Sequence, residues 1–436
     1  MAALQQALAM VPHELFTIFA FSAVFLVVAF LSATLPRSLP SKAPPLVSGC
    51  FPVVGAVKFF SARAEFFKEK ALESKSGIYT FFVGSYPVVG LSGPHGRSTF
   101  YDAKQLSLFE GYAGLLTATP GINSVENGSK FDSWFARKIS RLMKRDHLVK
   151  SLDHLVTDTE AALSQIARAN GQSQGVFDPF EHMNRIVYQL TLRTVGVHEL
   201  AEAAELLEKS RRLVEKIDDN NSTAKIVLPW LPAPKHISRL YNSVKFFLLI
   251  NGIVRQRKKE QRRFDDALQI LIDEDTSIAR IVMFVINALL AALLNSGMNA
   301  AWVLCHLAVN PYWLDKVRAE VNAALTKHRS NPEQRAVDIL RTLTIEDWET
   351  EFITTNMCLH ESIRLQTVGA AFRKNVSGRP VEIGNTGYSI PKDGYAAFHI
   401  DDIHMDPQIY SQPTKFDPSR YLPDRAEDKK VPFAYE

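Results

Sequence analysis

MCLHESIRL, from Met357 to Leu365, has the pattern of a helix and places Glu361 and Arg364 three residues apart. Residues with this spacing lie on one face of a helix, so the carboxylate and the guanidinium can form an ion pair. Such pairs are common on helix surfaces, and a surface ion pair is the simplest interpretation of these two residues taken alone. Only the flanking sequence can favour a buried, structural role.

Three groups of residues follow this helix: Gly387-Tyr-Ser-Ile-Pro391-Lys-Asp-Gly394, His404-Met-Asp406-Pro407 and Phe416-Asp-Pro418-Ser-Arg420. In this order and spacing, the helix and these groups resemble the K-helix, the sheet entry and the meander of the cytochrome P450 family. The resemblance implies that Arg420 joins Glu361 and Arg364 in a buried charge network that supports the haem loop. A carboxylate shared by two guanidinium groups satisfies many donors, and removing one member leaves a buried charge at a cost of about 3–5 kcal/mol.

Most of the chain has helical periodicity, with short β-rich runs near both ends. The runs at Ile78–Val83 and Val88–Leu91 are separated by a Gly- and Pro-containing turn, which predicts a hairpin. Similar short runs return at Val381–Ile383 and Tyr388–Ile390. Amphipathic helices are predicted over 133–168, 182–216, 236–273, 277–309, 311–327 and 347–366. Periodicity indicates a large, mainly α protein, and the resemblance implies the cytochrome P450 fold, mainly α with small β-sheets.

The predicted helix from Ser277 to Val309 is apolar on nearly all sides, so it must lie in the core of a large protein or in lipid. A second membrane span is the competing interpretation, although several Asn, Ser and Gly residues interrupt the apolar run. Its segment Ala291-Ala-Leu-Leu-Asn295-Ser296-Gly297 is similar to the family's helix over the distal haem face, where Ala-Gly-x-acid-Thr is usual. Here Ala292 replaces the Gly, Leu294 the acid and Asn295 the Thr.

Asn295 and Ser296 are therefore the candidate catalytic residues, and Ala291 and Ala292 are expected to lie against the cofactor. An amide can form hydrogen bonds to a bound substrate but is not a proton source. An Asn at this position resembles the branch that contains prostacyclin synthase and sterol hydroxylases, which includes an isomerase as well as hydroxylases. An isomerase or dehydratase that needs no reductase is thus an alternative to a monooxygenase.

The resemblance implies haem b as the cofactor. Arg373 matches the position that pairs with a haem propionate, with a plain surface arginine as the alternative. Trp134, Lys138 and Arg141 lie where the family has a second propionate partner. All four assignments depend on the resemblance.

Val431-Pro-Phe433-Ala-Tyr435 resembles the lead-in to the loop F-x-x-G-x-x-x-C-x-G, whose thiolate binds the haem iron. The printed sequence stops at Glu436, before that cysteine, so we expect a C-terminally truncated domain with no metal ligand and an enzyme that is inactive as given. Cys50, Cys305 and Cys358 are expected to be inert small hydrophobic residues. A haem-free product with a binding role, or with no role, is a further hypothesis.

Leu15 to Leu35 is a run of 21 uncharged residues, long enough to cross a bilayer core of about 30 Å. Arg37 and Lys42 follow it, which places the rest of the chain in the cytosol; a cleaved signal peptide is the alternative. Prolines after it predict a stiff spacer. We expect a transmembrane anchor over 1–35, a hinge over 36–55 and a cytochrome P450 domain over 56–436, held at the endoplasmic reticulum membrane.

The formal charge of +4 is small for 436 residues and the charges are interspersed, which argues against a nucleic-acid partner. By resemblance, the chain is a fungal microsomal monooxygenase that oxidises a bulky apolar small molecule, such as a secondary metabolite or a sterol- or terpenoid-like compound. Its expected partners are NADPH–cytochrome P450 reductase and the lipid bilayer. Substrate is expected to enter near Leu228–Trp230 and Phe246–Ile250.

Overall fold

The computed structural model describes residues 39–51, 53–115, 128–169, 176–219, 226, 234–367 and 369–432. The predicted membrane anchor, the beginning of the hinge, the predicted entry loop at Leu228–Trp230 and the lead-in from Phe433 onward lie outside the described residues.

A seven-stranded sheet combines strands from both ends of the chain, in the order β1-β2-β3-β4-β9-β6-β5. Its strands are β1 (Cys50–Phe51), β2 (Gly55–Ala56), β3 (Tyr79–Val83), β4 (Tyr86–Leu91), β5 (Leu106–Ser107), β6 (Ala370–Asn375) and β9 (Tyr395–His399). β3 and β4 form the predicted hairpin, and β4 pairs in parallel with β9, with Val88 opposite Tyr395. A separate two-stranded sheet contains β7 (Val381–Glu382) and β8 (Ser389–Ile390).

The predicted runs near the carboxyl end form β7 and β8, while the amino-terminal hairpin belongs to a larger sheet, because β9 joins it to β6. β6 and β9 were not predicted as strands. All five residues of β9 are buried, and a strand that is covered on both faces lacks the alternation by which a sequence reveals a strand.

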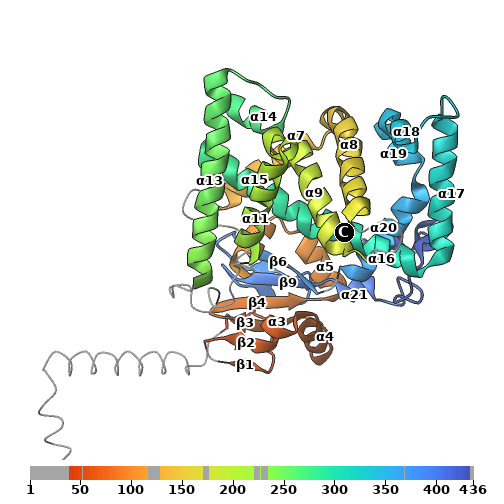
Figure 1. Cartoon of the computed structure of the whole chain (residues 1–436). Helices are drawn as coiled ribbons and strands as arrows, with labels where there is room; N and C mark the ends of the chain where they lie inside the picture. Colours follow the sequence, from red (N-terminus) through yellow and green to blue (C-terminus); the bar gives the residue numbers. More distant parts are fainter. Residues whose placement is uncertain are drawn as a thin grey trace, which may run out of the picture.

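The helices lie mainly on one side of this sheet (Figure 1). Those before residue 220 are α3 (Val57–Ser61), α4 (Arg63–Glu73), α5 (Gly93–Asp102), α6 (Leu108–Leu115), α7 (Gly128–Leu142), α8 (Arg145–Ala169), α9 (Pro179–Val195), α10 (His198–Glu202) and α11 (Ala204–Asp219). Those after it are α13 (Pro234–Glu260), α14 (Ala267–Asp273), α15 (Ile278–Ala292), α16 (Met298–Val309), α17 (Pro311–His328), α18 (Ala336–Thr342), α19 (Ile345–Thr350), α20 (Ile353–Gln366) and α21 (Asp401–His404). The π-turn η2 (Leu293–Gly297) joins α15 to α16, and the 3-10 turns η3 (Pro418–Tyr421) and η4 (Glu427–Lys429) follow near the end.

Caps divide the predicted long helices into shorter ones. The Asp178 side chain accepts hydrogen bonds from the backbone N–H groups of Phe180 and Glu181, and Pro179 occupies the first turn of α9. Asp266 likewise accepts from the Gln269 N–H and starts α14, so the predicted helix over 236–273 is two helices. The predicted helix over 182–216 is three, since α9 ends before Gly196 and α10 ends before Ala203.

The largest core surrounds α15. Ten consecutive residues, Ile281–Leu290, are buried, and they pack among side chains from α9, α11 and α13. Within the described chain, Ile278–Val309 is the helix long and apolar enough to cross a membrane, and half of its most apolar window is buried inside the protein. This packing favours a core helix over the second membrane span that the sequence left open.

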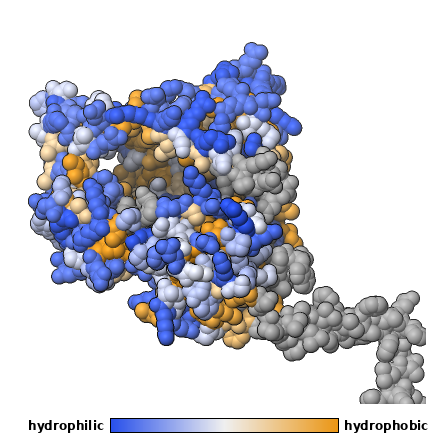
Figure 2. Space-filling view, turned by 180° about the vertical axis from the view of Figure 1, so that it is seen from behind, coloured by the Kyte–Doolittle hydropathy of each residue, from blue (hydrophilic) through white to orange (hydrophobic). Residues whose placement is uncertain are grey.

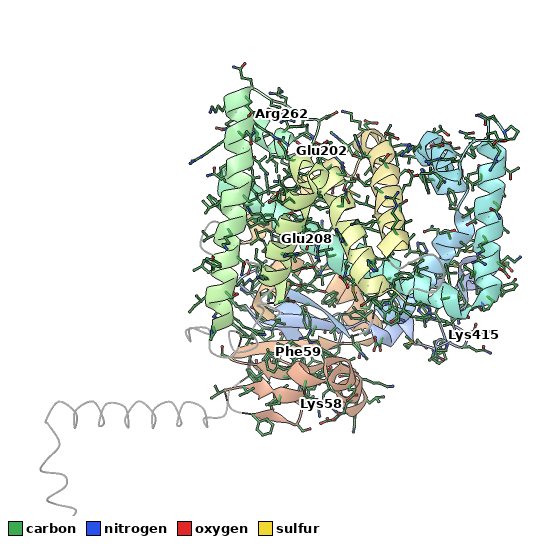
Figure 3. All side chains as sticks on the ribbon, in the orientation of Figure 1. Lys58, Phe59, Glu202, Glu208, Arg262 and Lys415 are labelled. Atoms are coloured by element: carbon green, nitrogen blue, oxygen red, sulfur yellow. The ribbon has the colours of Figure 1, made fainter. Side chains whose placement is uncertain are left out.

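A second core of aromatic rings links the two ends of the chain across the large sheet. The ring of Phe59 on α3, labelled in Figure 3, lies 5.7 Å from that of Phe81 on β3 and 5.9 Å from that of Phe372 on β6. The predicted fold class, mainly α with small sheets, is confirmed.

Candidate functional site

The central helix changes character at the motif that the sequence singled out. After the buried run, Ala291, Leu294, Asn295 and Ser296 are exposed and Ala292 is half-buried. The helix widens here into the π-turn η2, which covers Leu293–Gly297. Asn295 Nδ2 donates a hydrogen bond to the carbonyl oxygen of Ala291 at 2.7 Å. A π-turn inside an α-helix often marks a functional position, because it re-aims the side chains around it.

Gly297 explains why the turn can sit at this point. A Cβ atom added there would lie 2.0 Å from Oδ1 of Asn184 on α9, so any larger residue would require the Asn184 side chain to move. Asn184 Oδ1 is buried and has no hydrogen-bond partner among the described residues. A small pocket of about 150 Å³ lies beside the turn, with walls from α9, α11, Leu293, Leu294 and Met298.

The predicted charge residues of α20 and η3 meet in the interior. Arg364 donates to both oxygens of Glu361 at 2.8 Å, and Arg420 Nε donates to Glu361 Oε1 at 3.0 Å. The side chains of all three are fully buried. Burial alone would lower the pKa of Arg364, but the Glu361 carboxylate more than offsets this and raises the pKa above its usual value.

Glu427 on η4 is a further member that the sequence did not suggest. Arg420 Nη1 donates to its carboxylate at 2.9 Å, and Arg425 donates at the same distance. Burial opposes ionisation of Glu427, but these hydrogen bonds prevail and lower its pKa to about 2. The Tyr421 hydroxyl also donates to Glu361 at 3.2 Å. The network therefore fixes η3 and η4 against α20, near the last described residues.

Arg373 on β6 has an unsatisfied donor. Its Nη1 donates to the Tyr101 carbonyl oxygen at 3.3 Å, and its guanidinium lies 5.2 Å from the ring centroid of Phe100. Its Nε is buried without a hydrogen-bond partner among the described residues. Burial lowers the pKa of Arg373, so this cation is partly desolvated, and the described residues place no carboxylate in an ion pair with it. Such a guanidinium fits a bound carboxylate ligand.

The predicted residues of α7 have partners within the protein. Trp134 packs edge to face on Phe284 at 5.9 Å and lies under the guanidinium of Arg280 at 4.6 Å. Lys138 forms an ion pair with Glu274, and Arg141 Nη1 donates to the same carboxylate at 3.0 Å. The structure thus brings Lys138 and Arg141 together at the end of α14 and does not place them beside Arg373; their role as cofactor ligands stays a prediction.

The cysteines have the character of packing residues. Cys358 on α20 is buried, and burial raises the pKa of its thiol to about 12, so the thiol is neutral at physiological pH. Cys305 lies on α16 and Cys50 on β1, each half-buried. Only a thiolate is a good iron ligand, so Cys358 does not fit that role.

Apolar surfaces also line the hollows of the molecule, and Figure 2 shows a hollow with apolar walls on the back face. One groove of about 560 Å³ lies between α8 and the α18–α19 region, and Leu155, Leu340 and Trp348 are among its lining residues. A neighbouring pocket of about 530 Å³ shares Leu340 and Trp348. Neither is lined by Asn295 or Arg373.

Comparison with known proteins agrees with this arrangement. The cytochrome P450 family profile matches residues 44–435. Cytochrome P450 monooxygenase AacuE of Aspergillus aculeatus is 28% identical over 417 residues, covering 94% of this chain and 82% of its own length. Cytochrome P450 monooxygenase dmxR5 of Cryptosporiopsis sp. is 26% identical, covering 93% and 79%. Obtusifoliol 14-alpha demethylase of Sorghum bicolor is 23% identical, covering 88% and 76%.

A solved structure, retinoic acid bound cyanobacterial CYP120A1, has the same fold with a TM-score of 0.64 at 19% identity, covering 91% of this chain and 86% of that one. The family profile spans most of the chain, and the helices and sheets agree with this fold. The chain therefore belongs to the cytochrome P450 family, whose members are haem-iron oxidoreductases.

Proposed function

We propose that the chain is a membrane-bound monooxygenase of fungal secondary metabolism that oxidises a bulky apolar small molecule, such as a secondary metabolite or a sterol- or terpenoid-like compound. The family match over residues 44–435 is the observation that carries this proposal. The relatives in Aspergillus aculeatus and Cryptosporiopsis sp. are both named as monooxygenases, which favours oxygenation over the isomerase alternative.

The proposed cofactor is haem b, and Arg373 is its proposed anchor. The buried, unpaired Nε of Arg373 would donate to a propionate, which would also balance its partly desolvated charge. Lys138 and Arg141, together with Trp134, would hold the second propionate. To do so, Lys138 and Arg141 would release Glu274 and bind the propionate instead. When bound, haem supplies the activation of O₂, with electrons that we propose come from NADPH–cytochrome P450 reductase.

The central helix would shape the pocket beside the cofactor. The small side chains of Ala291 and Ala292 would leave room for oxygen and substrate. Nδ2 of Asn295 donates to the Ala291 carbonyl, so Oδ1 is the atom that would accept a hydrogen bond from a substrate hydroxyl or a water molecule and orient it. The exposed Ser296 hydroxyl would then pass the proton, because Leu294 offers none.

The chain is proposed to act at the endoplasmic reticulum membrane with its body in the cytosol. An anchor over 1–35 and a stiff hinge over 36–55 would hold the domain over 56–436 against the bilayer. Apolar substrates collect in the bilayer, so this position would deliver them to the enzyme.

Isotope labelling tests the reaction type. Microsomes containing the protein and the reductase would be incubated with NADPH, ¹⁸O₂ and a panel of sterols, terpenoids and other apolar polycyclic compounds. The proposal predicts a product that gains one ¹⁸O atom and forms only with NADPH. A product isomeric with its substrate, formed without NADPH, would instead establish the isomerase.

A further inference from the structure

Three metal-ligand side chains meet where α17 ends beside α19, shortly before the helix α20 that carries Glu361 and Arg364. They are His328, the last residue of α17, Asp347 in α19, and Glu351, which directly follows α19. One ligand atom from each lies within 4.8 Å of the others. All three side chains are partly enclosed, with exposed fractions of 22%, 25% and 17%. Figure 1 shows α17 and α19 at the same edge of the molecule.

The imidazole faces both carboxylates and lies within ion-pair distance of each. His328 Nε2 lies 3.5 Å from Glu351 Oε1 and 3.8 Å from Asp347 Oδ1. The same nitrogen is buried and has no hydrogen-bond partner in the described part of the chain. A buried ring nitrogen without a partner is costly unless another group occupies the space in front of it.

These separations suit a shared metal ion better than hydrogen bonds. Zinc binds nitrogen and oxygen ligands at about 2.0–2.2 Å, so two tetrahedral ligands stand about 3.3–3.6 Å apart. The two distances from His328 Nε2 are at or slightly above this range and need only a small closure. An imidazole with two carboxylates is a ligand set for zinc and similar transition ions, whereas calcium and magnesium prefer oxygen ligands alone.

Asp347 is held in place by the capping box of α19, which it forms with Thr344. Its Oδ2 accepts hydrogen bonds from the Thr344 backbone N–H at 2.8 Å and from the Thr344 hydroxyl at 2.7 Å. These bonds lower the pKa of Asp347 and leave Oδ1, the oxygen nearer His328, available. Such outer partners orient ligands and raise metal affinity.

Lys327 is the competitor for the site. Its ammonium group forms an ion pair with Glu351 and lowers the pKa of that carboxyl. The Lys327 side chain is 63% exposed, so it can turn into solvent when a cation arrives. We propose that His328, Asp347 and Glu351 form a zinc-binding site, completed by water, that ties the end of α17 to α19.

The test is titration of the metal-free full chain with ZnCl₂ by calorimetry, with Co²⁺ as a spectroscopic probe. The wild type is expected to bind one Zn²⁺ at this site and to give the visible absorption of tetrahedral Co²⁺. His328→Ala should abolish that absorption and weaken Zn²⁺ binding by more than tenfold, and Thr344→Val should weaken it about tenfold through loss of the outer partner. Lys327→Met should tighten it about fivefold, since one nearby positive charge is removed.

Asp315→Asn on the same helix is the matched control, because Asp315 is exposed and lies outside the cluster. It should bind Zn²⁺ as the wild type does. The proposal is wrong if the wild type binds no Zn²⁺, or if His328→Ala, folded by circular dichroism, retains the wild-type affinity. Since none of these three residues is proposed to hold haem or substrate, failure here leaves the proposed oxygenase untouched.

Discussion

Fully buried charged residues give the most specific predictions, and Arg420 is one of them. Arg420→Met leaves Glu361 and Glu427 buried with fewer donors, so we expect a loss of about 3–5 kcal/mol in the free energy of unfolding. Urea unfolding followed by circular dichroism measures it. Arg318→Met is the control: Arg318 is 67% exposed and pairs weakly with Asp315, so the change should be below about 1 kcal/mol. Equal losses in both variants would refute a special role for the network.

Sequence alone gave only part of this network. The Glu361–Arg364 pair was predictable because it is local to one helix. Arg420 came from the family resemblance and lies beside the pair as expected. The contact of Glu427 with Arg420 could not be predicted from the sequence. It depends on the left-handed backbone of Ala426, with φ of 38°, which precedes Glu427.

His404 makes stability depend on pH. Burial lowers its pKa to about 4 from an ordinary value of 6.5, and the nearby Arg364 charge adds to this. As the pH falls from about 6.5 to 4, His404 becomes protonated in the unfolded chain but stays neutral in the folded chain. The free energy of unfolding therefore falls by about 3 kcal/mol. His404→Gln should lose correspondingly less across this window. Urea midpoints between pH 7 and pH 4 that run parallel for the two proteins would contradict the assignment.

Arg373 tests the cofactor contact. Arg373→Leu removes the proposed propionate donor, so purified protein should hold less haem per chain and release it faster to a haem scavenger. Arg379→Leu, an exposed arginine just beyond the same strand, is the control and should match the wild type. Unchanged haem content and release in Arg373→Leu would exclude Arg373 as an anchor.

At the scale of elements, the π-turn of the central helix should depend on Gly297. Gly297→Ala places a methyl group against Asn184 Oδ1, so we expect a loss of about 1–3 kcal/mol, partly restored by adding Asn184→Ala. Gly252→Ala on α13 has open space around it and should gain up to about 1 kcal/mol. Thermal or urea unfolding of the four proteins measures both effects. If Asn184→Ala restores nothing, the contact does not determine the turn.

Helix boundaries and turns inside helices were the features that the sequence pattern did not predict. Hydrophobic periodicity predicted one long helix over 277–309, and the structure has that span, but a π-turn adds only one residue to a turn and leaves the apolar pattern intact. Helix breaks at Gly196 and around Asp266 were missed, because the apolar pattern continues across them while the backbone does not.

For the whole molecule, the sequence predicted a mainly α protein, and the resemblance supplied the family that the comparisons show. Contacts between distant segments could not be predicted from the sequence. The pairing of β4 with β9 and the engagement of Lys138 and Arg141 by Glu274 both join residues more than 130 positions apart. Long-range pairings of this kind depend on the packing of the whole chain, which no local pattern encodes.

The proposal that most needs a direct test is that this protein binds a haem that activates oxygen. The most direct measurement is the carbon monoxide difference spectrum of the reduced protein, expressed in microsomes. We expect the red-shifted Soret band of haem with an axial thiolate, by analogy with the family. Well-folded protein that takes up no haem, or haem whose carbon monoxide complex lacks that shift, would contradict it.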